Sequence, residues 1–74
     1  MIDAARALRL ATKLDALLAA NASAQTAALG RIADGDLSPE ADAAADATFW
    51  RGETLAARYA VVERYLPRVA HLTA

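Results

Sequence analysis

The side chains that most often perform catalysis or bind metals are scarce in this sequence. The chain has one histidine, His71, and no cysteine, so a transition-metal site would have to be built from carboxylates. The densest acidic segment opens at Asp34 like a calcium loop, but Pro39 stands where such a loop needs glycine and Ala45 where it needs a bidentate glutamate. We therefore predict no metal, no cofactor and no small-molecule substrate.

The residue patterns for nucleophilic catalysis and for phosphate binding are also absent from the sequence. The chain contains no Gly-x-Ser-x-Gly turn, and its glycines stand alone at positions 30, 35 and 52, which does not match a phosphate-binding loop. We predict that the protein is not an enzyme and that no residue in it is catalytic.

Large aromatic residues and nearby arginines are the most distinctive groups with a possible binding role. Phe49 and Trp50 lie on the side of the predicted second helix that is otherwise acidic. Arg51 and Arg58, which are seven residues apart, lie on the opposite flank of that helix. Tryptophan and arginine are enriched among the residues that dominate binding energy at protein interfaces. Phe49, Trp50, Arg51 and Arg58 are therefore the predicted partner interface. Packing of both aromatics into a second copy, or under a broken first helix, is an equal alternative.

Charge is unevenly distributed although the net charge is only −1. Residues 1–33 and 49–74 each carry four basic and two acidic side chains, whereas residues 34–48 carry five acidic side chains and no basic one. We expect an acidic tip formed by Asp34, Asp36, Glu40 and Asp42. Because proteins that follow a phosphate backbone usually have a clear positive charge, we predict contact with nucleic acid only through a partner.

Composition indicates a thin core. Hydrophobic residues make up 57% of the 74 residues, but 22 of them are alanines, which leaves few large side chains to bury. A domain of this size buries only ~60% of its unfolded surface, and cysteine is absent, so no disulfide compensates. We expect a homo-oligomer, a complex with a larger protein, or both.

The elements that position these groups are predicted from one strong break in the sequence. Gly35 is typical of the position after a helix, and Ser38-Pro39-Glu40 has the pattern of a helix start. We predict one all-α domain over residues 1–74: an antiparallel hairpin with helices at about 3–33 and 39–72, an acidic loop at 34–38, and assembly into a helical bundle. Pro67 is expected to kink or end the second helix.

Apolar periodicity predicts how the two helices pack. In the second helix an apolar or small residue recurs every three or four positions from Ala41 to Val69, as in a coiled-coil seam. The large residues expected in the helix–helix seam are Leu10, Leu14, Leu17, Leu55, Tyr59, Val62 and Leu66.

Two polar residues interrupt the apolar side of the first helix and support the pairing. With the loop centred near residue 36, Asn21 and Gln25 face Gly52 and Thr48, where small side chains leave room for amides. The alternative is a break in the first helix near Asn21, which would give three helices.

The sequence gives no membrane or targeting signal. Its longest apolar run has five residues, far fewer than the ~20 that a membrane span needs. We predict a cytoplasmic protein without a membrane contact.

Besides a general interaction module, the sequence suggests two more specific functions. The stretch from Leu29 to Leu37 and the segment from Arg51 to Ala56 resemble the small subunit of exonuclease VII, although the acidic run of that family's first helix is missing. The resemblance implies a coiled-coil hairpin that serves as accessory subunit of a nucleic-acid-processing enzyme. A third hypothesis is a mobile-element or phage-encoded structural component or inhibitor that binds a host complex through the acidic tip.

Overall fold

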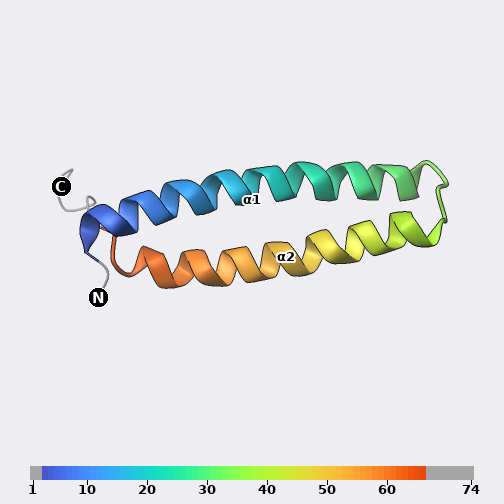
Figure 1. Cartoon of the computed structure of the whole chain (residues 1–74). Helices are drawn as coiled ribbons and strands as arrows, with labels where there is room; N and C mark the ends of the chain where they lie inside the picture. Colours follow the sequence, from blue (N-terminus) through green and yellow to red (C-terminus); the bar gives the residue numbers. More distant parts are fainter. Residues whose placement is uncertain (1–2, 67–74) are drawn as a thin grey trace, which may run out of the picture.

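The computed structural model describes residues 3–66, which form two long antiparallel helices joined by a short loop (Figure 1). Helix α1 spans Ala4–Ala33 and helix α2 spans Pro39–Glu63. The predicted all-α hairpin is confirmed. Because α1 continues through Asn21 without interruption, the alternative of a break there is wrong.

Both helices begin with a side-chain cap. The Asp3 carboxylate accepts a hydrogen bond from the Arg6 backbone N–H at 2.8 Å. The Ser38 hydroxyl accepts one from the Ala41 backbone N–H at 3.3 Å, and Pro39 occupies the first helical position. Each cap satisfies a backbone donor that has no partner within its helix, which is why the helices start at these residues.

The loop begins with a glycine in a left-handed conformation. Gly35 has φ +98°, and its N–H donates to the Ile32 carbonyl at 3.0 Å, while the Asp36 N–H donates to the Arg31 carbonyl at 2.9 Å. These two bonds form a Schellman motif, which satisfies the last carbonyls of α1. The chain can therefore reverse within the segment from Asp34 to Ser38.

Helix α2 ends earlier than the predicted residue 72. After Glu63 the backbone N–H groups of Arg64, Tyr65 and Leu66 each donate to the carbonyl three residues back, which tightens the last turn. The sequence supplies a physical reason, because a proline at 67 has no N–H to offer the Glu63 carbonyl and disfavours helical geometry at the residue before it. The seam position predicted at Val69 lies outside the described residues.

The hydrophobic core is narrow and made mainly of small residues. Of the six buried hydrophobic side chains, four are alanines, and no large side chain in the described part is fully buried. Ala7, Ala11 and Val62 form a cluster near the chain ends, against which Leu10, Leu14, Tyr59 and Leu66 pack. The core thus follows the contact line between two helices and has no second layer.

Asn21 fixes the register of the hairpin. Its side chain is 7% exposed, and its amide nitrogen donates to the Thr48 carbonyl across the interface at 2.9 Å. A Cβ atom placed on Gly52 would lie 3.1 Å from the same amide nitrogen, so glycine leaves the space that the amide occupies. The predicted pairing of Asn21 with Gly52 is confirmed. The hydrogen bond to Thr48 was not predicted, because the sequence paired Thr48 with Gln25.

Neither helix, over the described residues, has a stretch both long and apolar enough to cross a membrane.

Candidate interaction surfaces

The predicted seam residues lie along the contact between the helices. Leu55 and Val62 are buried, and the other five are half-buried, namely Leu10, Leu14, Leu17, Tyr59 and Leu66. These side chains hold the hairpin together and leave only part of their surface for a partner.

One side of the hairpin carries a groove between the helices, which we call the basic groove. Its larger part, of about 530 Å³, is lined by apolar side chains and by two cationic residues, Lys13 from α1 and Arg58 from α2. Its smaller part, of about 280 Å³, shares Leu17 with the larger part and reaches Arg51. The apolar and small residues lining the two parts are Leu10, Leu14, Leu17, Ala20, Ala24, Ala47, Val61 and Val62.

A second surface, which we call the aromatic–acidic face, lies on α2 and consists of Asp42, Asp46, Phe49, Trp50 and Glu53. Spacings of four, three and four residues align Asp42, Asp46, Phe49 and Glu53 along one side of the helix. The Phe49 and Trp50 rings meet edge to face with centroids 5.2 Å apart, yet the side chains remain 47% and 61% exposed. The face therefore presents two aromatic rings among three carboxylates.

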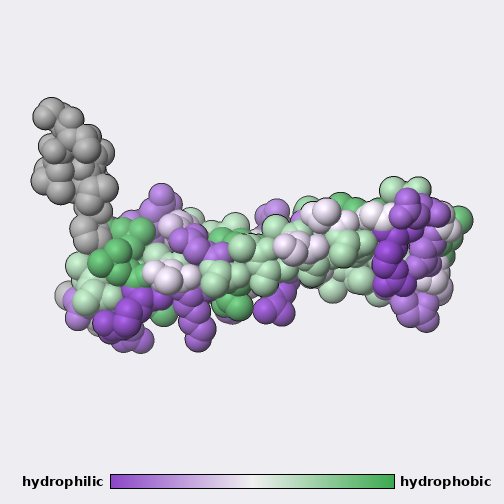
Figure 2. Space-filling view, turned by 90° about the horizontal axis from the view of Figure 1, so that it is seen from above, coloured by the Kyte–Doolittle hydropathy of each residue, from purple (hydrophilic) through white to green (hydrophobic). Residues whose placement is uncertain are grey.

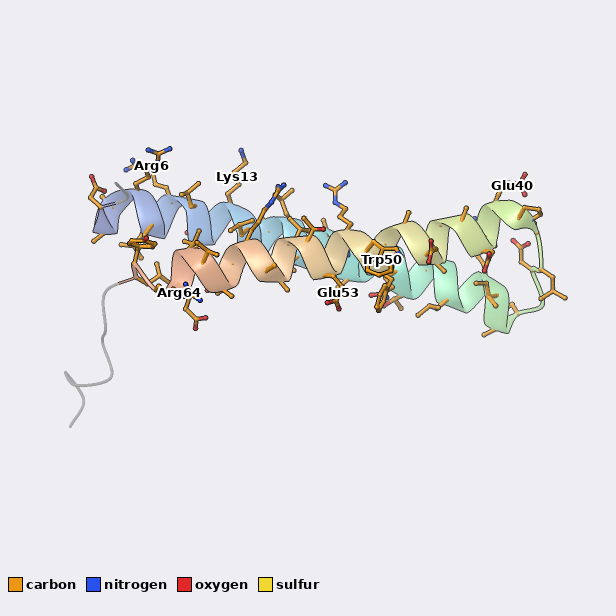
Figure 3. The ribbon with its side chains drawn as sticks, turned by 90° about the horizontal axis from the view of Figure 1, so that it is seen from below. Arg6, Lys13, Glu40, Trp50, Glu53 and Arg64 are labelled. Carbon is orange, nitrogen blue, oxygen red and sulfur yellow. The ribbon has the colours of Figure 1, made fainter. Side chains whose placement is uncertain are left out.

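The two surfaces point to different sides of the hairpin. Figure 3 shows Arg6 and Lys13 projecting from one side and Trp50 and Glu53 lying toward the other. Since Arg58 lines the same groove as Lys13, the structure divides the predicted interface set. Arg51 and Arg58 belong to the basic groove, whereas Phe49 and Trp50 belong to the aromatic–acidic face.

The charges of these surfaces are not neutralised within the hairpin. The only ion pair among residues 3–66 joins Arg31 to Asp36, with N and O atoms 2.8 Å apart. Lys13, Arg51 and Arg58 thus have no carboxylate within 4 Å in the described part, and the acidic residues of the aromatic–acidic face have no cation. Exposed charges of one sign on one surface attract a surface of the opposite sign.

Asp36 differs from the other residues of the predicted acidic tip because its carboxylate is held by the loop itself. It accepts hydrogen bonds from the Ser38 backbone N–H at 3.0 Å and from two nitrogens of Arg31 at 3.1 and 2.8 Å. Hydrogen bonds from the Ser38 side chain and backbone, followed by that from Arg31, lower the pKa of Asp36 from 3.8 to about 2.

The rest of the acidic tip remains on the surface. The side chains of Asp34, Glu40 and Asp42 are exposed. Figure 2 shows hydrophilic side chains gathered at the loop end of the molecule and a largely apolar surface over the middle of the helices. The tip is therefore a solvated acidic surface around one carboxylate that stabilises the turn.

Sequence reasoning missed two of these features. The first is the Arg31–Asp36 ion pair, which joins the two residues whose backbone groups bond in the Schellman motif. Because Gly35 is typical of that motif, it could have indicated the pair. Val61 stands one residue before a seam position, and its place in the groove depends on the distance between the helices, which the sequence pattern does not give. Within the described residues, no group of three or more histidine or acidic side chains is placed to hold a metal ion.

Comparisons with protein-family models, with curated proteins and with solved structures gave no match for this chain. The functional interpretations drawn from the sequence therefore stay predictions.

Proposed function

We propose that this hairpin is a non-catalytic protein–protein interaction module, which self-associates or docks as a small accessory subunit onto a larger protein. The observation that carries the proposal is the placement of its largest apolar side chains. Trp50 and Phe49 are largely exposed, while most of the buried hydrophobic positions hold alanine. Full burial of a large apolar side chain contributes about 1.5–3 kcal/mol, which a partner would supply here.

The unneutralised charges support the same proposal. Asp42 and Asp46 are four residues apart on one side of α2, and like charges at this spacing destabilise a helix by a few tenths of a kcal/mol. A partner with basic groups would remove this repulsion. The exposed aromatics and the uncompensated acids occupy the same face, so one partner surface would cover both.

Size-exclusion chromatography with light scattering tests self-association directly. We expect a mass above the 7.8 kDa of one chain, rising with protein concentration, and a thermal midpoint that rises with it. Trp50→Ala should lower the mass toward one chain. Leu37→Ala is the matched control, because Leu37 is an exposed apolar residue in the loop.

A helical monomer whose mass and thermal midpoint are independent of concentration would contradict self-association. The interaction module itself would be excluded if that monomer also retained no larger protein in a pull-down, or retained one equally well after Trp50→Ala.

A further inference from the structure

Two surfaces of opposite charge lie on different sides of one chain, and each has an apolar centre. The basic groove is lined by apolar side chains beside Lys13 and Arg58, and the aromatic–acidic face has exposed rings beside Asp46 and Glu53. We propose that the basic groove of one hairpin binds the aromatic–acidic face of a second copy of this chain. This inference rests on the proposed function and names the partner and the two surfaces that meet.

The spacing of the charges supports the pairing. Arg51 and Arg58 are seven residues apart on α2, and so are Asp46 and Glu53. At ~1.5 Å per residue, each pair spans about 10.5 Å along its helix. Two cations on the groove therefore match two carboxylates of the second copy when the helices lie along each other.

The apolar parts of the two surfaces are also complementary. Trp50 and Phe49 are the exposed aromatic residues of the aromatic–acidic face, and the larger part of the groove offers about 530 Å³ lined by leucine and valine side chains. This space is large enough to admit the indole of the second copy's Trp50 beside Arg58, whose guanidinium is attracted to an aromatic face. Burial of the ring supplies affinity, and the charged residues around it fix the orientation.

The geometry of the contact determines how the assembly grows. The groove and the aromatic–acidic face are different surfaces, so their contact is heterologous and leaves one free groove and one free face in every dimer. Further copies add at both ends until a ring closes, or without limit. The expected assembly exceeds a dimer as concentration rises, and it weakens with added salt because exposed charges are screened.

Charge reversal on each surface tests the pairing. The groove variant is Arg51→Glu with Arg58→Glu, and the face variant is Asp46→Lys with Glu53→Lys. All four side chains are exposed, so the helices should persist. Each variant alone places like charges in the contact, so we expect light scattering to give the mass of one chain. An equimolar mixture should associate, because each chain then meets a surface of opposite sign.

A fourfold variant carrying all four reversals should also associate by itself, which shows that none of the changes prevents folding. Arg9→Glu with Arg64→Glu is the control for altered charge, because both arginines are exposed and neither lines the groove. It should keep the mass of the wild-type assembly. Circular dichroism checks the helicity of every variant.

The outcomes separate this inference from the proposed function. A face variant or groove variant that still associates like the wild type would overturn the heterologous contact, since it would show that one surface pairs with itself or takes no part. A mixture or a fourfold variant that stays monomeric would overturn it as well. A wild-type chain that is monomeric at every concentration would instead remove self-association altogether.

Discussion

Near the loop the two helices meet through alanines and one amide, whereas toward the chain ends leucine, tyrosine and valine side chains pack around the buried alanines. In the loop half, Ala28 and Ala41 are buried, and Asn21 bonds to the Thr48 carbonyl. In the end half, Val62 anchors the cluster of larger side chains. Polar contacts thus determine the register of the two helices near the loop, and apolar burial holds the helices together toward the chain ends.

The difference separates two tasks that a larger core performs together. Small residues bury little apolar area, so the loop half contributes mainly register, through the Asn21 contact and the capped turn. Larger side chains bury more apolar area, but one can replace another along a seam without defining which residues face each other. The end half therefore contributes mainly to the free energy of unfolding. Stability and register should therefore respond to different substitutions.

The largest expected effect comes from the end half. Leu55→Ala removes a side chain that is 5% exposed and should lower the free energy of unfolding by about 2–3 kcal/mol, because transfer and cavity costs add. Leu29→Ala in the loop half, where the side chain is 51% exposed, should cost about 0.5 kcal/mol or less. Urea unfolding followed by circular dichroism, at a concentration where the chain is monomeric, measures both. Equal losses would remove the distinction between the halves.

A smaller effect tests the register contact. Gly52→Ala should improve helix propensity by about 1 kcal/mol, but the new methyl group crowds the Asn21 amide nitrogen at 3.1 Å. We expect little gain in the wild-type background and about 1 kcal/mol when Asn21→Ala is present. A double-mutant cycle by urea unfolding gives the coupling energy. Additive effects would mean that Gly52 and Asn21 do not depend on each other.

The smallest effect concerns the turn and depends on pH. Because the pKa of Asp36 is lowered to about 2, its ionised form stabilises the folded state above the unfolded pKa of about 4, and this contribution is lost as pH falls toward 2. Asp36→Asn should therefore be less stable than the wild type near neutral pH, with the difference shrinking between pH 4 and 2. Thermal unfolding across that range measures it. A difference independent of pH would show that the carboxylate does not hold the turn.

The fold was predictable where local signals and packing agreed. Gly35, Ser38 and Pro39 mark the turn by backbone chemistry alone, and the small residues opposite Asn21 indicated the register. The end of α2 was less predictable, since a proline can kink a helix or end it according to what packs beyond it.

The candidate surfaces were predictable in part. Exposure of Phe49 and Trp50 followed from their positions outside the seam. The division between Trp50 and the pair Arg51 and Arg58 also followed from the sequence, because residues adjacent in sequence project from a helix about 100° apart. A groove also forms only when both helices contribute, and the pattern of one helix cannot show it.

Trp50 is the only tryptophan in the chain, so its fluorescence reports directly on the central claim that a partner copy covers this side chain. In dilute protein the emission should be that of a solvent-exposed indole, in agreement with its 61% exposure in the single hairpin. As concentration rises and the mass by light scattering increases, the emission maximum should shift to shorter wavelength. An emission maximum that stays constant while the mass increases would contradict the account, because the assembly would then leave Trp50 in solvent.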